Sequence, residues 1–194
     1  MANVVPSLWW SMVDLGNSAG LVLAAGSGQR FGGPKAPFVF EGERLVDRAV
    51  RILREAGLTK VFVVLGAWVG EVPQATVIEN PDFASGMASS LRTGLVFLAT
   101  EEPQLERVVI TLVDHIGLST EAITEIASAQ GGLIQSTYEG KIAHPVVIGR
   151  EHWAALINEV SGDVGAKDYL TRNNATRVEL GELATNTDLD YRPA

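Results

Sequence analysis

The sequence of 194 residues contains no cysteine. Disulfide bonds, thiolate metal ligands and thiol nucleophiles are therefore excluded, and nothing indicates an oxidising compartment. Without cysteine a zinc site is not expected, and His115 and His152 are given no role of their own. Any reactive group has to be sought among the other side chains.

Long hydrophobic runs are missing as well. Nothing approaches the roughly 20 apolar residues that a membrane-spanning helix needs, so no membrane partner is expected. Residues 1–19 lack the basic start and the apolar stretch of about 7–15 residues of a signal peptide. Asp14 interrupts the one apolar run in this region. We therefore predict a cytoplasmic protein in which residues 1–19 form a leader of unknown role, with Trp9 and Trp10 loosely held.

Positive charge is scarce. Fifteen Lys and Arg residues stand against 23 Asp and Glu residues, which gives a formal net charge of -8. The phosphate backbone of nucleic acids favours clustered cations, so no nucleic-acid partner is expected. A small anionic substrate remains compatible with this charge, because a few local cations can serve one pocket. With 46% hydrophobic residues, the chain is long enough for one sizeable core and short for two.

Apolar segments that are typical of strands alternate with segments of helical spacing. Strands are expected over residues 21–25, 61–65, 76–78, 107–113, 133–137, 142–148 and 176–180, and helices over 45–56, 87–100, 119–130, 151–160 and 164–172. Continuous apolar strands separated by helices indicate a mostly parallel sheet that is covered on both faces. The predicted fold class is α/β, as a single three-layer α/β/α, Rossmann-like domain over residues 20–194.

Behind the first expected strand lies a glycine-rich stretch, residues 21–35, which reads LVLAAGSGQRFGGPK. A P-loop requires G-x-x-x-x-G-K-[ST], in which the hydroxyl holds magnesium. Gly28 and Gly33 have that spacing, but Pro34 intrudes before the lysine. Ala36 stands where the hydroxyl is required, so a P-loop is excluded.

A dinucleotide fingerprint fails on different residues. It requires G-x-G-x-x-G after a strand, and an acid at the end of the next strand to hold the ribose. Here Gly26, Gly28 and Gly32 give G-x-G-x-x-x-G, and the strand over residues 61–65 is followed by no acid.

A third signature, L-A-A-G-x-x-x-R-x-G-x-x-K, fits the stretch. Glycines after a strand let backbone N–H groups approach phosphate oxygens. Arg30 and Lys35 would neutralise a triphosphate and the charge that develops on pyrophosphate. Asp114 ends the expected strand over residues 107–113, and ligands bind at the carboxyl ends of parallel strands. A carboxylate there can hold Mg²⁺ against the triphosphate.

The chain resembles the molybdenum cofactor cytidylyltransferases and related molybdopterin nucleotidyltransferase-like proteins from Gly20 to Asp190. Besides the glycine signature, five segments carry the resemblance in the order of that family: NPDFASGMASSL from Asn80, LVD ending at Asp114, AHPV from Ala143, SGDVGAK from Ser161 and DLD from Asp188. The resemblance implies a nucleotidyltransferase domain that binds a nucleoside triphosphate and a phosphorylated small-molecule acceptor, the molybdenum cofactor, with a molybdoenzyme as a further partner.

The resemblance also implies roles for individual residues. Catalytic roles fall to Arg30, Lys35 and Asp114, and Mg²⁺ ligands are Asp114 and Asp190, with Asp188 as a neighbour. Nucleotide binding is expected of Leu23, Ala24, Ala25, Gly26, Ser27, Gly28, Arg30, Lys35, Asn80, Ser89, Ser90 and Asp114. Acceptor binding is expected of His144, Pro145, Gly165 and Lys167. In the resembling proteins L-A-A-G accompanies cytosine nucleotides and L-A-G-G guanine nucleotides, so Leu23–Gly26 predicts CTP over GTP.

Several positions depart from the family pattern. The proline of L-x-D-x-P is absent after Asp114, Ala143 stands where glycine is usual before His144, and Tyr191-Arg192 replaces Thr-Pro after the last acid. Two alternatives therefore stay open. One is an NAD(P)-dependent oxidoreductase of a small aromatic metabolite, which uses residues 26–32 as a dinucleotide loop. The other is a non-catalytic nucleotide-binding protein that delivers cofactor to a molybdoenzyme.

Overall fold

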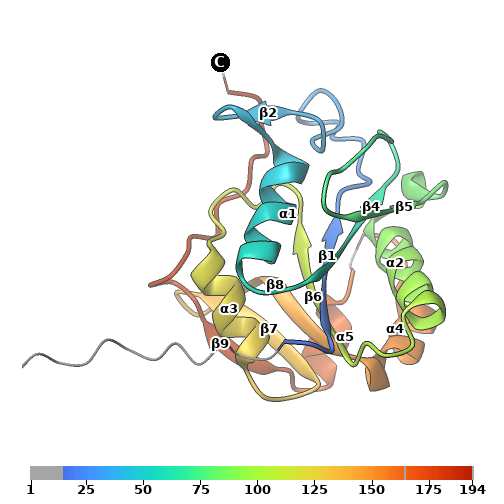
Figure 1. Cartoon of the computed structure of the whole chain (residues 1–194), viewed down its shortest axis with the longest axis vertical. Helices are drawn as coiled ribbons and strands as arrows, with labels where there is room; N and C mark the ends of the chain where they lie inside the picture. The colour runs from blue at the N-terminus through green and yellow to red at the C-terminus, as the bar shows by residue number, and fades with distance from the viewer. Residues whose placement is uncertain (1–14, 164, 194) are drawn as a thin grey trace, which may run out of the picture.

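The computed structural model describes residues 15–163 and 165–193, so the expectations for Trp9, Trp10 and most of the leader lie outside the described residues. At its centre is a seven-stranded sheet (Figure 1). In sheet order its strands are β5 (Thr76–Glu79), β4 (Lys60–Leu65), β1 (Ser18–Leu23), β6 (Arg107–Leu112), β8 (Lys141–Gly149), β7 (Leu133–Tyr138) and β9 (Thr176–Glu179). Only β8 runs antiparallel to its neighbours within the described sheet. The predicted mostly parallel α/β domain is thus confirmed.

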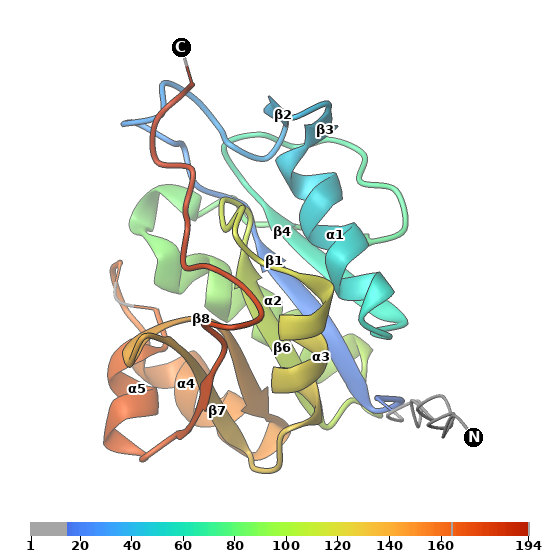
Figure 2. The ribbon, with the colours of Figure 1, turned by 90° about the vertical axis from the view of Figure 1, so that its left-hand side faces the viewer.

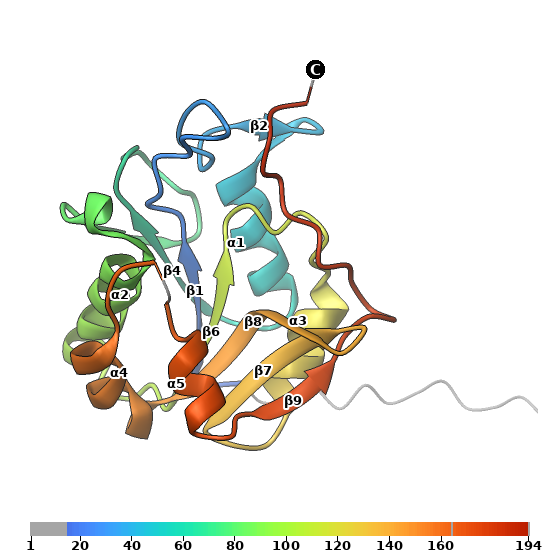
Figure 3. The ribbon, with the colours of Figure 1, turned by 180° about the vertical axis from the view of Figure 1, so that it is seen from behind.

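Helices cover both faces of the sheet, as Figure 1 and Figure 3 show from opposite sides. One face carries α1 (Leu45–Glu55) and α3 (Thr120–Ser128), and the other carries α2 (Met87–Glu101), α4 (Trp153–Glu159) and α5 (Lys167–Arg172). Short 3₁₀ turns over Phe83–Ser85 and Arg150–His152 precede α2 and α4. Each face buries its own apolar cluster, which accounts for the three layers.

Helix α1 illustrates why the sequence folds as predicted. Its apolar residues recur at helical spacing and are buried on one face of the helix. Gly57 follows the helix with a φ of 98°, and its N–H donates to the Arg54 carbonyl at 3.0 Å. This left-handed glycine ends the helix and turns the chain into β4.

The order of the strands creates a switch point at β1. From β1 the chain passes through α1 to β4 and β5 on one side, and then through α2 to β6 on the other side. Leu23 pairs in register with Leu112 of β6 and with Val64 of β4, so the carboxyl ends of these strands meet at one edge. Ligands of open α/β sheets bind in the crevice at such a point.

Three local features differ from the sequence prediction. A small hairpin of β2 (Val39–Phe40) and β3 (Glu43–Arg44) lies between the glycine-rich stretch and α1. Strand β1 begins at Ser18, and Leu15 before it is buried in the core, so ordered structure starts before residue 20. The helix expected over residues 151–160 begins with a 3₁₀ turn. Within the described residues, no helix has the length and apolarity to cross a membrane.

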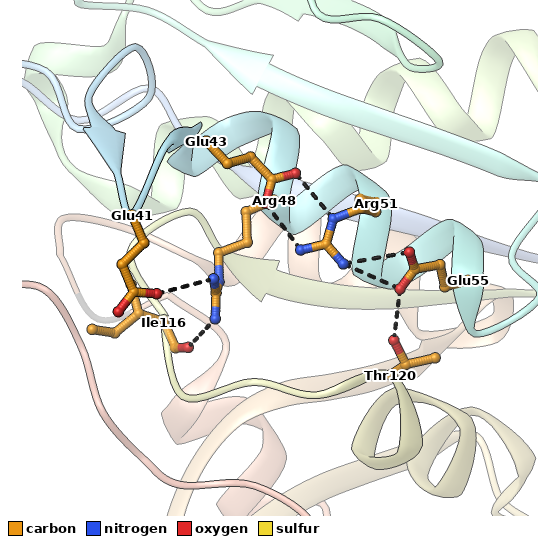
Figure 4. A network of polar contacts seen from close by, with 7 residues as sticks. All are labelled: Glu41, Glu43, Arg48, Arg51, Glu55, Ile116 and Thr120. Carbon is orange, nitrogen blue, oxygen red and sulfur yellow. Dashed lines mark hydrogen bonds and ion pairs between the residues drawn. The ribbon is translucent and has the colours of Figure 1, made fainter.

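A polar network on α1 supports the segment that follows β6 (Figure 4). Arg48 donates to the carbonyl of Ile116 at 3.1 Å, and its guanidinium lies 3.7 Å from the Glu41 carboxylate. In the same network, Thr120 at the start of α3 donates to Glu55 at 3.1 Å. The helix therefore holds the backbone two residues beyond Asp114.

Candidate functional site

The glycine-rich loop leaves β1 at the switch point. The N–H of Ala24 donates to the Val64 carbonyl at 2.9 Å, and the Ala25 carbonyl accepts from Ala67 at 3.0 Å. These bonds hold the first turn of the loop against β4. The backbone N–H groups of Gly26, Ser27 and Gly28 donate to no protein acceptor in the described part of the chain. They remain available to a ligand.

Gly28 closes the loop in a way that only glycine allows. Its φ is +60°, and a methyl group placed on it would lie 2.0 Å from the carbonyl oxygen of Gly33. The carbonyl of Gly28 accepts hydrogen bonds from Gly32 at 2.8 Å and from Gly33 at 3.1 Å. The loop is therefore a compact ring of backbone, and not an open connection.

A cavity of about 640 Å³ lies beside this loop. We call it the nucleotide cavity, because the sequence predicts that its loop binds a nucleotide. Its walls come from the loop, from the segment before and at the start of α2, and from the end of β6. The predicted residues among them are Leu23, Ala24, Ala25, Gly26, Ser27, Gly28, Lys35, Ser90 and Asp114.

Lys35 and two acids meet at one end of this cavity. The Lys35 ammonium lies 2.7 Å from Asp114 Oδ2 and 3.4 Å from Asp190 Oδ1. The side chains of Lys35 and Asp114 are 14% and 20% exposed, and that of Asp190 is 50% exposed. Three residues that are far apart in the sequence thus form one charged cluster.

The C-terminal segment brings Asp190 to this cluster. Figure 2 shows it running from β9 past the end of β6 toward the glycine-rich loop. The Leu189 N–H donates to the Asp114 carbonyl at 2.9 Å. The backbones of Asp188 and His115 form an isolated antiparallel β-bridge. Partial burial, and next the nearby charge of Asp114, raise the pKa of Asp188. The ammonium of Lys35 contacts Asp190 and not Asp188.

Asn80 and Ser89 lie behind the cavity wall. The Asn80 side chain is 1% exposed, and its amide donates to Ser89 Oγ at 2.8 Å and to Ser90 Oγ at 3.1 Å. Ser89 Oγ also donates to the Gly86 carbonyl at 2.8 Å. Ser90 lines the nucleotide cavity, whereas the amide of Asn80 is fully used inside the protein. Asn80 therefore orients the serines at the start of α2.

Two predicted residues, Arg30 and Pro145, do not line the nucleotide cavity. They are also absent from the walls of a smaller cavity that adjoins it. Arg30 is exposed on the loop and has no ion-pair partner among the described residues. Pro145 is buried, and its carbonyl accepts from Ser136 Oγ at 2.6 Å. The His144–Pro145 peptide bond is cis.

A second, smaller cavity of about 160 Å³ adjoins the first. We call it the ring cavity, because its volume is that of a cavity that holds one six-membered ring. Leu23 and Met87 line both. The other walls come from β6, β7, β8 and α5 and include three predicted acceptor residues, namely His144, Gly165 and Lys167. Burial, and next the nearby His115, lower the pKa of His144 to about 4. The imidazole is therefore neutral at pH 7.

A β-bulge aims His144 into the ring cavity. Gln135 pairs with Val146, but the next residue of β7, Ser136, pairs with Ala143, so β8 contributes two extra residues at this point. Such a bulge bends the strand and redirects side chains. Spacing in the sequence gives no sign of it, because both strands read as continuous.

Sequence reasoning missed three residues in or near these cavities. Asp163 lines the nucleotide cavity and accepts from the N–H of Met87 at 3.3 Å. Gln135 lines the ring cavity from β7, whose sequence LIQSTY contains three consecutive polar residues. Arg192 lies 5.4 Å from the ring centroids of Phe31 and Phe38, next to the glycine-rich loop. The segment SGDVGAK, which carries part of the family resemblance, contains Asp163 and could have indicated it. Nothing in the sequence indicated Gln135 or Arg192.

Residues 20–178 match the family described as the MobA-like NTP transferase domain. The chain is 31% identical over 195 residues to a nicotine blue oxidoreductase of Paenarthrobacter nicotinovorans, with 91% of this chain and 94% of that protein covered. It is 29% identical to a probable molybdenum cofactor guanylyltransferase of Bacillus cytotoxicus, with 89% and 82% covered.

Solved structures share the fold. A mycobacterial protein from strain JC1, a homolog of Rv0371c, matches with a TM-score of 0.76 at 21% identity, covering 90% of this chain and 91% of that one. Rv0371c of Mycobacterium tuberculosis in complex with manganese matches with a TM-score of 0.62 at 21% identity, covering 84% and 87%.

Proposed function

The chain belongs to the MobA-like NTP transferase family, and on this premise we propose that it transfers a nucleoside monophosphate, CMP from CTP, to a phosphorylated small-molecule acceptor and releases pyrophosphate. One observation carries the proposal. A loop with three free backbone N–H groups faces one cavity at the switch point of the sheet together with Lys35 and Asp114, and Asp190 contacts Lys35 beside it.

In the proposed reaction, a phosphate oxygen of the acceptor attacks the α-phosphorus of the triphosphate in line. The bond from the α-phosphorus to its bridging oxygen breaks, and pyrophosphate takes the electron pair. Lys35 and the loop N–H groups stabilise the negative charge that develops on pyrophosphate, and Arg30 adds charge if it turns inward on binding. The acceptor phosphate is already an anion near neutral pH, so the protein needs no strong base and no covalent intermediate.

Asp114 and Asp190 are the residues that would hold a divalent metal. They fit one because both carboxylates already converge on a single cation, the Lys35 ammonium. Mg²⁺ is usually bound by one or two carboxylates together with substrate phosphates and water. No group of three or more potential ligand side chains exists within residues 15–163 and 165–193, so the remaining ligands would come from the nucleotide. When bound, the metal neutralises phosphate charge.

CTP is the proposed nucleotide because Ala25 stands where a glycine accompanies guanine nucleotides. Its side chain is 2% exposed and lines the nucleotide cavity. The methyl group reduces the room for a purine beside the loop. The guanylyltransferase named among the relatives makes GTP the natural competitor.

The molybdenum cofactor is the proposed acceptor, and a molybdoenzyme that receives the product is the corresponding partner. The cavity lined by His144, Gly165 and Lys167 supports this, because it adjoins the nucleotide cavity and carries a cation for a phosphate.

The proposal is tested by incubating the purified protein with each of the four ribonucleoside triphosphates, a divalent metal and purified molybdopterin, and by measuring pyrophosphate release. We expect acceptor-dependent release that is fastest with CTP. Nucleotide binding without release would identify a cofactor-delivery protein, and release that does not need the acceptor would contradict the proposed transfer.

A second candidate is reduction of a small aromatic compound with NAD(P)H. The similarity to the nicotine blue oxidoreductase favours it. The geometry argues against it, since β4 ends at Leu65 and continues into Gly66, Ala67 and Trp68, with no acid to hold a ribose. Titration with NADH and NADPH decides: saturable binding supports the oxidoreductase, and no heat or absorbance change removes it.

A further inference from the structure

The ring cavity differs in character from the nucleotide cavity beside it. Its walls are mostly aliphatic, with Leu91, Ile110 and Leu170 among them. Its volume of about 160 Å³ is close to that of an engineered apolar cavity of roughly 150 Å³ that holds benzene. One six-membered ring therefore fits inside, whereas a fused ring system enters only by its terminal ring.

The charges around the ring cavity exclude an ionised ring. His144 is neutral at pH 7, because burial lowers its pKa to about 4. Among the described residues of the lining, Lys167 alone has a charged side chain, and it is exposed at the rim. A charged ring inside would lose its hydration and gain no counter-ion. An anionic substituent outside the mouth would meet the Lys167 ammonium.

Gln135 supplies the specific polar group. The residue is 6% exposed, and its side-chain amide makes no hydrogen bond to any residue in the described ranges. The amide is not sealed inside the core, because it reaches the open space of the cavity. A ligand with a matching edge can pair with it there in place of water. The amide offers both a donor and an acceptor, which suits a ring lactam.

We propose that the ring cavity binds one flat, uncharged ring with a lactam-like edge, which pairs with the Gln135 amide, while an attached anionic group lies at Lys167. The proposal rests on the proposed function only in assigning this ring to the acceptor. On this proposal, Gln135 is the residue that selects the acceptor. When the acceptor is a fused ring system, its terminal ring alone enters the ring cavity.

The test uses the full chain without nucleotide and three single-ring probes: 2-pyridone, benzene and N-methylpyridinium, whose ring stays charged at pH 7. Binding is measured by ligand-observed NMR. We expect 2-pyridone to bind at least tenfold more tightly than N-methylpyridinium. Gln135→Leu should weaken 2-pyridone at least tenfold and leave benzene unchanged or tighter. Gln104→Leu, the same change on an exposed loop, is the matched control and should change neither affinity.

Two results would overturn the proposal: a charged ring that binds as tightly as 2-pyridone, or a Gln135→Leu protein with unchanged 2-pyridone affinity. If Gln135→Leu does not fold, Gln135→Met replaces it, and the probe series on the unchanged protein decides by itself. The measurement needs no triphosphate. Binding of 2-pyridone without pyrophosphate release would therefore contradict the proposed transfer and leave this inference standing. Pyrophosphate release without 2-pyridone binding would contradict this inference and leave the proposed transfer standing.

Discussion

The ammonium of Lys35 lies 2.7 Å from Asp114 Oδ2, and the same ammonium reaches Asp190 at 3.4 Å. The cation proposed for the triphosphate therefore neutralises, in this structure, the two carboxylates proposed for the metal. A metal and Lys35 cannot both occupy this place. Nucleotide binding would draw Lys35 toward the phosphates and free the carboxylates.

Lys35→Ala is expected to lower turnover by about 10²-fold or more, as for other losses of one preorganised electrostatic contact. It should also raise the affinity for Mn²⁺ alone, because two carboxylates lose their counter-ion. Pyrophosphate release and Mn²⁺ titration measure the two effects. Lys141→Ala, at the exposed first residue of β8, is the control. Turnover within about threefold of the unchanged protein would place the triphosphate elsewhere.

Asp114→Asn is expected to reduce metal-dependent turnover far more than the free energy of unfolding. The side chain is 20% exposed, and the backbone bond from Leu189 to its carbonyl does not depend on the carboxylate. Turnover as a function of metal concentration is compared with urea unfolding. Asp168→Asn on α5 serves as the control. Equal loss of stability and activity would make Asp114 a structural residue.

Gly28→Ala is expected to impair nucleotide binding at least tenfold, because its methyl group would lie 2.0 Å from the Gly33 carbonyl oxygen. Gly42→Ala is a matched control, since Gly42 also has a positive φ, +88°, but nothing within 4 Å of the added methyl group. Nucleotide titration followed by calorimetry compares them. Similar affinities in the two variants would show that the closed loop does not bind phosphate.

His144 is expected to make the protein less stable in acid. Burial lowers its pKa to about 4 in the folded state, whereas the unfolded chain has the ordinary value near 6.5. Between these values the unfolded state binds more protons, so stability is full above about pH 6.5 and falls as the pH drops toward 4. His144→Gln should flatten this slope relative to the unchanged protein in urea unfolding at pH 7 and pH 5. An unchanged slope in His144→Gln would mean that the imidazole is solvated.

Ala25→Gly is expected to erode the preference for CTP over GTP by roughly tenfold, since a steric or hydrogen-bond difference of this size is typical of substrate discrimination. The ratio of kcat/KM values for the two nucleotides is the readout. The same ratio before and after the change would show that the tetrapeptide does not select the base.

Much of the fold follows from the sequence, for identifiable reasons. Strands β1, β4 and β6 in the middle of the sheet are buried over nearly their whole length and read as apolar runs, and α1 shows helical spacing with Gly57 at its end. Asp114 could be expected at the site because it follows a buried strand, and carboxyl ends of parallel strands share one edge. The β2–β3 hairpin was missed because each of its strands has only two residues.

The rest of the site depends on contacts that periodicity does not encode. Asp190 lies in an irregular segment, and the backbone bond between Leu189 and Asp114 sets its position. Its role was expected only from the family resemblance. Asn80 was expected on the nucleotide, but its amide is held by Ser89 and Ser90. Gln135 was missed because it is followed by two other polar residues, Ser136 and Thr137, and nothing in the sequence shows which of them faces a cavity.

The most direct test of the central claim follows the phosphorus atoms of CTP. The protein is incubated with acceptor, divalent metal and CTP that is labelled either at the α- or at the γ-phosphorus. The account predicts that the α-label appears in the acceptor product and the γ-label in pyrophosphate. Transfer of the γ-label to the acceptor, or release of the γ-label as orthophosphate by the pure protein, would contradict nucleotidyl transfer.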